Sequence, residues 1–377
     1  MFFQREYVRE AVAMTIGGVL KLDLPEHGLL SSLLIRISGA EATGYGQTGG
    51  AWRIIDEISK VSVLGNASVI IKSLTGYQAQ AMAFYDQGVI PPGSWRNYAT
   101  NVQFEYMLIN FGRWMFDTEV GLDLAKFNNV ELQIENIATA ATFSDLTVSI
   151  MGIYLRDVPV RQFTGYMRSE EWRSWATVQD QTVYNNLPTE HPIRRVVLQA
   201  IPYCTTNGVA DTTMNNLMDD VEFSLDTGQI RVYKGGIDDL MRENFLDTGK
   251  PVIVGGFPYM NADYGIDMSL GYIYGASWGA GSQDGGVATT FPTMESALTF
   301  HTQKPESYDG DHPIGLLCIG MSPFLTVQFR FDHSYLPTDW LNPEVRKTVQ
   351  LNIHTRNAAT ADLGKNAIVL DRYVATP

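Results

Sequence analysis

One order of predicted elements, strand, turn, strand and short helix, occurs twice along the chain. Residues 60–88 read as a strand, a Gly-Asn turn, a second strand and a short helix, and residues 221–249 have the same order with an Asp-Thr-Gly turn. Both predicted helices stop at a glycine, where a left-handed cap has little steric penalty. Internal repetition fixes architecture more firmly than any single motif. This pair indicates a duplicated unit.

A second pair of segments follows in the same order. Residues 130–134 (VELQI) precede a small-residue turn and a closing strand at 146–154, and residues 349–353 (VQLNI) precede a similar turn and a closing strand at 367–373. Literal identity between the copies is low, so either match alone is compatible with chance. Two matches in the same order favour a duplicated β domain.

Alternation of apolar and polar residues dominates both halves, which is typical of half-buried strands. Helical periodicity is confined to four short segments, which we predict at residues 2–12, 77–86, 169–178 and 237–246. The chain of 377 residues is long enough for two domains, and each half suffices for an eight-stranded sandwich.

We therefore expect four parts in the chain. They are a helical N-terminal arm at 1–18, a first sandwich at 19–160, a linker with a helical segment at 161–180, and a second sandwich at 181–377. Residues 255–313 look poor in strands and rich in Gly, Tyr, Ser and Asp. Loops of that length are normally functional or interface-forming, so this one is expected to project from the second sandwich.

Composition excludes several classes of protein. The formal charge of −14 repels phosphate backbones, so direct sequence-specific nucleic-acid binding is not expected. No apolar run reaches the length of a transmembrane helix. Cys204 and Cys318 are too few for a disulfide scaffold or a multi-cysteine zinc site, which leaves open whether the two pair with each other.

Signals for catalysis are weak. Residues 275–279 (GASWG) match the Gly-x-Ser-x-Gly nucleophile elbow, but the glycine-rich continuation cannot form the helix that this motif needs. The six histidines have no metal-binding spacing, and Asp309 and Asp311 are weak candidates for a hard cation, without a complete EF-hand loop. We expect no enzyme activity and no cofactor.

Aromatic residues are the better candidates for function. One set lies in the long loop and suits either a protein interface or a sugar platform: Tyr259, Tyr264, Tyr272, Tyr274 and Trp278. A second set lies in the N-terminal segment, which is expected to contact a membrane, a neighbouring subunit or its own domain: Phe2, Phe3, Arg5, Tyr7 and Arg9.

This organisation resembles the double jelly-roll major capsid proteins of tailless icosahedral viruses, the lineage of membrane-containing bacteriophages and the adenovirus hexon. The resemblance covers nearly the whole chain and rests on architecture, together with the sequence of residues 127–134 (FNNVELQI) at the end of the first unit. It implies an all-β fold of two tandem eight-stranded jelly-roll β-sandwiches with short helices and a long loop insertion in the second.

The resemblance also implies a structural role. Three chains would form a pseudo-hexameric capsomer that tiles the virion shell, after assembly in the host cytoplasm and next to other capsid proteins. The loops at 91–123 and 255–313 would face outward, and the N-terminal arm would lie at the base, facing an internal membrane or neighbouring capsomers.

Two other readings stay open at this point. A two-domain β-sandwich that binds or hydrolyses carbohydrate predicts a cleft with two carboxylates and an exposed aromatic platform. A structural surface protein outside viruses predicts no closed trimer.

Overall fold

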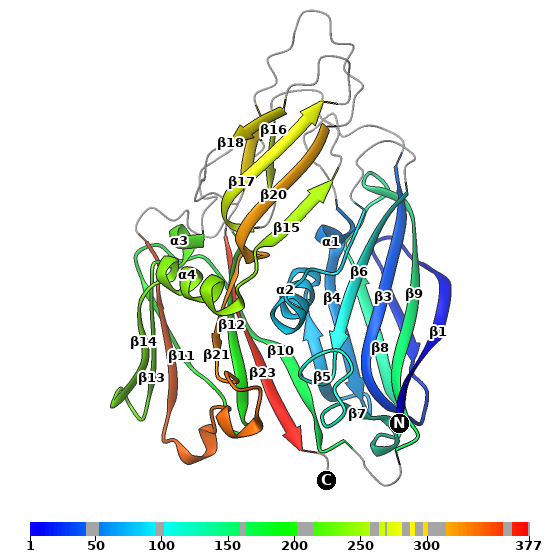
Figure 1. Ribbon diagram of the computed structural model, residues 1–377, viewed down its shortest axis with the longest axis horizontal. Helices are drawn as coiled ribbons and strands as arrows, with labels where there is room; N and C mark the ends of the chain where they lie inside the picture. Colours follow the sequence, from blue (N-terminus) through cyan, green and yellow to red (C-terminus); the bar gives the residue numbers. More distant parts are fainter. Residues whose placement is uncertain are drawn as a thin grey trace, which may run out of the picture.

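The computed structural model describes residues 1–42, 53–94, 102–158, 163–201, 214–256, 264–267, 270–280, 287–290, 297–300, 314–356 and 364–375. Strands dominate this part of the chain, and they form two sandwiches side by side (Figure 1). We call the part from β1 to β9 the first half and the part from β10 to β23 the second half.

The strands of the first half are β1 Phe2–Met14, β2 Val19–Asp23, β3 Leu29–Glu41, β4 Ile58–Gly65, β5 Val69–Leu74, β6 Val102–Asn110, β7 Leu122–Asp123, β8 Val130–Asn136 and β9 Phe143–Arg156. Those that build the second sandwich are β10 Gly165–Ala176, β11 Thr182–Asn186, β12 Ile193–Ile201, β13 Asp220–Leu225, β14 Ile230–Gly236, β21 Thr326–Arg330, β22 Val349–His354 and β23 Lys365–Ala375. The α-helices are α1 Ile54–Glu57, α2 Gly76–Gln87, α3 Met214–Leu217 and α4 Ile237–Thr248. Three 3₁₀ turns lie at Leu124–Lys126, Pro337–Asp339 and Pro343–Val345.

Both sandwiches have the same topology. The first half has the strand orders β1-β9-β3-β6 and β2-β8-β4-β5, with β7 added beside β3, and the second has β10-β23-β12-β21 and β11-β22-β13-β14. When the eight main strands of each half are numbered in chain order, both halves read 1-8-3-6 and 2-7-4-5. This arrangement is a jelly roll. The predicted pair of eight-stranded jelly-roll sandwiches is confirmed.

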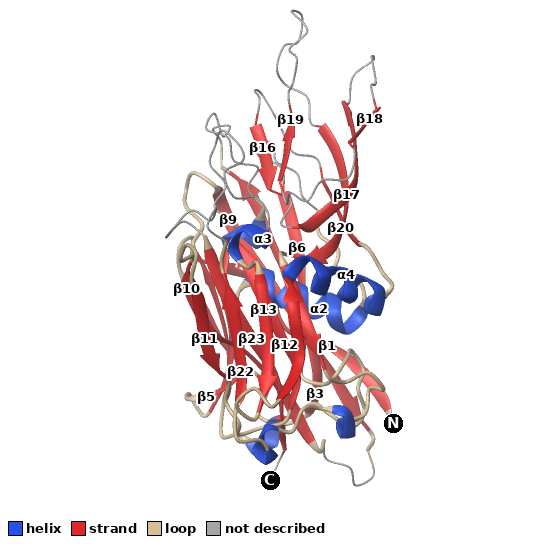
Figure 2. Ribbon diagram, turned by 90° about the vertical axis from the view of Figure 1, so that its left-hand side faces the viewer, coloured by secondary structure: helices blue, strands red, loops and turns tan. Residues whose placement is uncertain are grey.

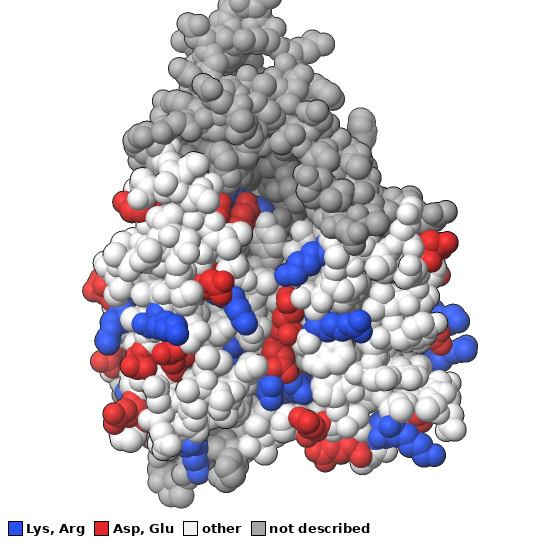
Figure 3. Space-filling view, turned by 180° about the vertical axis from the view of Figure 1, so that it is seen from behind, with Lys and Arg blue, Asp and Glu red and all other residues white. Residues whose placement is uncertain are grey.

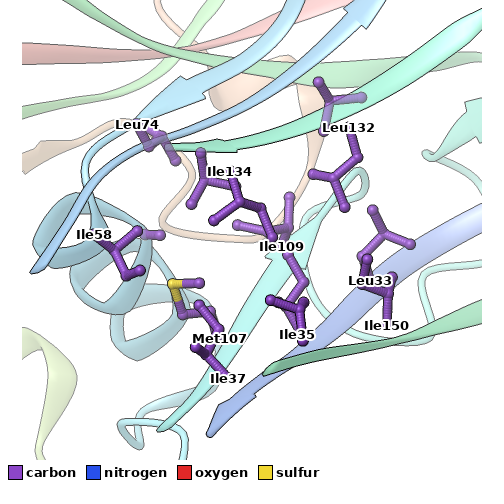
Figure 4. Packing of buried hydrophobic residues seen from close by; sticks show 14 of the residues in the cluster. Leu33, Ile35, Ile37, Ile58, Leu74, Met107, Ile109, Leu132, Ile134 and Ile150 are labelled. Carbon is purple, nitrogen blue, oxygen red and sulfur yellow. The ribbon is translucent and has the colours of Figure 1, made fainter. Parts of the chain in front are cut away.

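Alternating strands place their apolar faces between the two sheets of each sandwich. In β8, Val130, Leu132 and Ile134 are buried while Glu131 and Gln133 are partly exposed. Figure 4 shows the resulting core, in which side chains from β3, β6 and β9 meet those from β8 and the end of β5. A second apolar cluster fills the other sandwich.

Each half has a helix directly after its fifth main strand. The N-cap of α2 is Thr75, whose side chain takes part in a capping box with Gln78, and its C-cap is Gly88 with φ 72°. The C-cap of α4 is Gly249 with φ 61°. These helices agree with those predicted at 77–86 and 237–246, and glycine is needed at both ends because φ is positive there. Figure 2 shows both helices toward one end of the upright strands.

The predicted helix at residues 2–12 is wrong, and with it the helical arm at 1–18. This segment is β1, which pairs antiparallel with β9 from Phe2 to Met14. Register shifts interrupt the pairing between Tyr7 and Arg9 and again before Val12, and Ala11 has φ 50°. Such bulges add residues to the strand and shift the alternation, which produced an apparent helical spacing.

The predicted helix at 169–178 is also wrong, so residues 161–180 are not a linker with a helical segment. β10 covers most of that range as the first strand of the second sandwich and pairs with β23. A register shift lies between Glu171 and Arg173. Trp172, between them, and Trp175 both pack on the second core, so their spacing of three mimicked a helix.

Residues 255–313 and the segments that flank them contain more strand than predicted. β15 Val252–Gly256, β17 Leu270–Ala280, β18 Val287–Thr290 and β20 Ile314–Pro323 form a four-stranded sheet in the order β15-β20-β17-β18, and β16 Tyr264–Asp267 pairs with β19 Ala297–Phe300. Figure 1 shows this sheet beyond one end of the sandwiches, whereas β1 begins and β23 ends at the other end. The description of this segment as a strand-poor loop is wrong for the described residues, because they form these strands.

Candidate functional site

The two halves share one continuous sheet. β5 runs parallel to β10, with Lys72 opposite Ser169 and Ser73 opposite Glu170. This pair joins β2-β8-β4-β5 to β10-β23-β12-β21 as a single eight-stranded sheet. Strand pairing therefore fixes how the second sandwich sits on the first. We call the contact around β5, α2, β10, β12 and β23 the junction.

Two adjacent arginines of β12 are buried at the junction. The side chains of Arg194 and Arg195 are 2% and 1% exposed. Arg194 donates from Nη1 to Asp86 of α2 at 2.9 Å and from Nε to Asp332 at 2.7 Å. Arg195 donates from Nη2 to the same oxygen of Asp86 at 2.6 Å. One carboxylate of the first half thus binds two cations of the second.

A third carboxylate completes the network from the side of β23. Asp371 accepts hydrogen bonds from Ser169 Oγ at 2.7 Å and from Arg194 Nη1 at 3.3 Å. Ser169 in turn accepts from Nζ of Lys72 at 2.7 Å. Three buried cations on Lys72 and the arginine pair therefore face three buried carboxylates. Buried charges are stable only when they are paired in this way.

The network shifts the acidity of its members. Burial lowers the pKa of Lys72 to about 8. The negative charges of Asp371 and Asp86 raise this pKa, while the positive charges of Arg194 and Arg195 lower it further. Burial pushes the pKa of Asp332 upward, but the neighbouring arginines hold it below its usual value. Asp332 is therefore ionised at neutral pH, while Lys72 is partly neutral in mildly alkaline solution.

Apolar and aromatic contacts surround these charges. Tyr77 of α2 stacks on Phe324 with ring centroids 5.3 Å apart, and Tyr85 donates from its hydroxyl to the carbonyl oxygen of Thr326 at 3.0 Å. A cavity of about 10 Å³ is left between α2, β6 and β10, lined among others by Lys72, Asp86 and Ser169. That is room for one water molecule, so the junction is closely packed.

The place on the second half that corresponds to the junction is open. A groove of about 530 Å³ lies between β14, α4 and β21. We call it the β14 groove; its lining residues include Val232, Tyr233, Leu240, Asn244, Asp247 and Arg330. Among the described strands, β14 has a single neighbour, β13, and β1 has a single neighbour, β9. Both edges leave backbone groups for pairing with another chain.

The structure places the predicted N-terminal residues on the edge strand β1. Phe2 and Tyr7 are 53% and 49% exposed. Phe3 packs edge-on against Phe116 with centroids 5.1 Å apart, and the guanidinium of Arg5 lies over the same ring at 5.2 Å. Arg9 is exposed and donates to the carbonyl oxygen of Val8. These side chains lie on a fixed strand that is available for contacts.

The predicted outer-loop residues are placed only in part. Tyr264 lies on β16, and Tyr272, Tyr274 and Trp278 lie along β17. Because the two strands belong to different sheets, these residues do not share one loop. Tyr259 and the weak cation candidates Asp309 and Asp311 fall outside the described residues.

The described residues offer little for catalysis. The Gly-Ala-Ser-Trp-Gly segment lies within β17 and pairs with β20 and β18 on either side, so Ser277 is not on a strand-to-helix turn. In the described part of the chain no group of three or more His, Cys, Asp or Glu could hold a metal ion, and no helix is long and apolar enough to cross a membrane.

Of the two cysteines, the structure describes only one. Cys318 is a free, buried thiol, and burial raises its pKa to about 12, which keeps it protonated and unreactive at neutral pH. Cys204 lies outside the described residues, so a pair between the two stays untested.

Charges of both signs are interspersed on the surface. Figure 3 shows Lys and Arg lying among Asp and Glu over the described part of one face, without a continuous basic area. The described part of this face therefore carries no extended basic surface of the kind that attracts a polyanion.

Sequence reasoning missed the buried network. The one available signal is Ile193-Arg194-Arg195-Val196, two adjacent arginines inside an otherwise apolar strand. Arginine is rarely buried unless it is paired, so this pair predicts buried carboxylates nearby. The identity of Asp86, Asp332 and Asp371 as the partners depends on tertiary structure.

Comparisons with known proteins agree with this topology. No protein-family model and no curated protein sequence matches the chain. Among solved structures, the chain is similar over 100% of its length to 98% of the MCP of Sulfolobus Turreted Icosahedral Virus, with a TM-score of 0.61 and 11% identity. The chain has the double jelly-roll fold.

Two further structures carry the same fold at low identity. The major capsid protein P2 of bacteriophage PM2 matches 99% of this chain and 98% of its own, with a TM-score of 0.52 and 9% identity. VP54 of PBCV-1 matches 99% of this chain and 94% of its own, with a TM-score of 0.52 and 11% identity. The double jelly roll is thus shared across the full length of all three proteins.

Proposed function

We propose that this protein is the major capsid protein of a tailless icosahedral virus. The observation that carries the proposal is the match of the whole chain, both sandwiches in the same order, to major capsid proteins. A fold shared at about a tenth identity does not by itself assign a role. Here the duplicated sandwich adds a physical reason for a role in a shell.

Duplication suits a shell. Three chains with two equivalent sandwiches each give an outline of six similar units, so one polypeptide can occupy lattice positions through quasi-equivalent contacts. The junction supports this use, because a continuous sheet and a buried charge network hold the two sandwiches of a chain at a fixed angle. The proposed role is structural and needs no catalytic site.

The same proposal covers partners and location. The capsomer would be a homotrimer that contacts neighbouring capsomers and other capsid proteins, in a virion assembled in the host cytoplasm. The sheet formed by β15, β20, β17 and β18 would extend toward one face of the shell. β1 is bound into the first sandwich, so contact with an internal membrane through a free helical arm is not part of the proposal.

The experiment is to purify the full chain and measure its mass by size-exclusion chromatography with light scattering. We expect a trimer of about three times 42.0 kDa, and electron microscopy of concentrated samples is expected to show hexagonal capsomers or closed shells. A monomer that binds or hydrolyses members of a glycan panel would overturn the proposal in favour of the carbohydrate-active alternative.

A further inference from the structure

Each half contains the same set of parts around its fifth main strand. In the first half these parts are β5, α2 and β6, and in the second they are β14, α4 and β21. The helices end at Gly88 and Gly249, which are 161 residues apart and both left-handed. The same interval relates Lys72 to Tyr233 and Asp86 to Asp247.

These parts are covered in one half and uncovered in the other. In the first half, β10 and β23 lie against them and leave the cavity of about 10 Å³ that Lys72 and Asp86 line. In the second half, the equivalent residues Tyr233 and Asp247 line the open β14 groove of about 530 Å³. Even a polar contact recurs, because Asn110 donates to Asp86 at 3.0 Å and Arg330 donates to Asp247 at 3.0 Å.

The strand that covers the first half has its own equivalent. β10 is the first strand of the second sandwich, and β1 is the first strand of the first sandwich. Both carry a bulge, which lies between Glu171 and Arg173 in β10 and between Tyr7 and Arg9 in β1. Aligning the bulges relates Ser169 to Arg5 and Glu170 to Glu6.

We propose that β1 of a second copy of this chain docks parallel to β14 and fills the β14 groove, as β10 docks on β5 within one chain. The register within the chain, Lys72 opposite Ser169 and Ser73 opposite Glu170, transfers to Tyr233 opposite Arg5 and Lys234 opposite Glu6 of the second copy. This inference rests on the proposed function, since the second copy is the neighbour in the capsomer.

The side chains at the transferred positions are complementary. Lys234 is 60% exposed, with only a 3.7 Å contact to Glu222, and Glu6 is exposed on β1. Within the chain, Gln78 donates to Glu171 at 2.6 Å, and the transferred pair places the exposed carboxylate of Asp239 beside the hydroxyl of Tyr7. The two transferred pairs, Lys234 with Glu6 and Tyr7 with Asp239, each join a donor to an acceptor, and Lys234 and Glu6 also carry opposite charges.

The two surfaces also lie where a ring requires them. Figure 1 shows β14 and β1 at opposite sides of the molecule. When β1 of one copy contacts β14 of a second copy, β14 of the first and β1 of the second therefore stay available for further copies. Contacts of this head-to-tail kind generate closed rings or filaments. Strand addition at an open edge supplies backbone hydrogen bonds, and the groove supplies apolar burial.

The test is a disulfide between copies in the full chain. Residues opposite each other on adjacent strands lie about 5 Å apart, within the range of a disulfide. Glu6→Cys combined with Lys234→Cys is expected to give covalent dimers and trimers on a non-reducing gel after mild oxidation. The wild-type chain controls for Cys204 and Cys318. The control variant combines Glu6→Cys with Tyr184→Cys. Tyr184 is 72% exposed and lies on β11, at the opposite edge of the sheet that contains β14, so this variant is expected to give no cross-linked species.

Charge reversal provides a second measurement. Glu6→Lys and Lys234→Glu are each expected to weaken self-association by roughly tenfold or more, and the double variant is expected to restore it. A stable trimer without the 6–234 cross-link would overturn this inference and leave the capsid proposal standing. A chain that remains monomeric at all concentrations would overturn both.

Discussion

Asp86 is the residue on which the junction depends most. It accepts hydrogen bonds from both Arg194 and Arg195, although its side chain is only 7% exposed. Asp86→Ala leaves the two guanidinium groups buried with one counter-charge fewer. We expect a loss of about 3–5 kcal/mol in the free energy of unfolding, because an uncompensated buried charge is far more costly than a missing surface pair. Urea denaturation followed by fluorescence measures it.

An exposed ion pair gives the matched control. Arg356 donates to Asp219 at 2.7 Å, but the two side chains are 44% and 30% exposed. Arg356→Ala is therefore expected to change stability by less than about 1 kcal/mol. Equal losses for Asp86→Ala and Arg356→Ala would contradict the assignment of the buried network.

Lys72 makes stability depend on pH in a stated direction. Its pKa in the folded chain is about 8, below the unfolded value of 10.5, so between these values the unfolded chain binds more protons than the folded chain. Stability from this group therefore rises with pH across that window, by a few kcal/mol in total. Lys72→Met, which cannot titrate, is expected to lack this gain when both proteins are unfolded in urea at pH 7.5 and 9.5.

The comparison with Lys72→Met isolates the lysine from the tyrosines. Burial raises the pKa of Tyr154 to about 12, and tyrosines of this kind destabilise the fold only as the unfolded chain begins to ionise near pH 10. If wild type and Lys72→Met respond equally to pH, Lys72 does not carry the shift.

At the scale of elements, the two glycine caps form a natural pair. Gly88 and Gly249 both have positive φ, but a Cβ at Gly88 would meet Lys250 at 2.6 Å, whereas nothing lies within 4 Å at Gly249. Gly249→Ala is expected to lose about 1 kcal/mol from backbone strain alone, and Gly88→Ala somewhat more because the Lys250 side chain must move. Thermal unfolding of both variants measures the difference. A stabilising effect of either substitution would contradict the left-handed cap.

The sequence predicted those elements whose pattern is set by local environment. β8 and β22 face a core on one side and solvent on the other, so their alternation was visible, and the helices after β5 and β14 carried their glycine stops. β1 and β10 were misassigned because a bulge at Val8 and at Trp172 moves the apolar positions out of alternation. Bulges depend on pairing with a distant strand, which no local window contains.

The sheet β10-β23-β12-β21 explains another loss of signal. In β12, Val196 and Leu198 face the second core while Val197 belongs to the first, so nearly every residue of the strand is buried. A strand buried on both faces reads as a continuous apolar run instead of an alternating one. In β12, Arg194, Arg195 and Gln199 interrupt the apolar residues, so neither an alternating nor a continuous apolar pattern marks this strand in the sequence. The sandwich that covers its second face cannot be read from the sequence either, because the contact is between domains.

For the whole molecule, this shared sheet predicts how the chain unfolds. Val197, Phe324 and Val369 of the second half belong to the apolar cluster of the first, and Asp86 ties α2 to the arginines of β12. Opening one sandwich would therefore expose apolar surface and unpaired buried charges of the other. Although multi-domain chains often unfold in steps, we expect a single calorimetric transition for the wild-type chain.

Weakening the junction should separate the two sandwiches without removing either core. Asp86→Ala combined with Tyr77→Ala deletes the shared carboxylate and the ring that stacks on Phe324, and leaves the apolar centre of each sandwich in place. We expect its calorimetric trace to split into two transitions, the more stable one corresponding to one sandwich folded alone. Two transitions already present in the wild type would mean that the sandwiches are energetically independent. In that case the junction would not hold the fixed angle that a tiling capsomer requires.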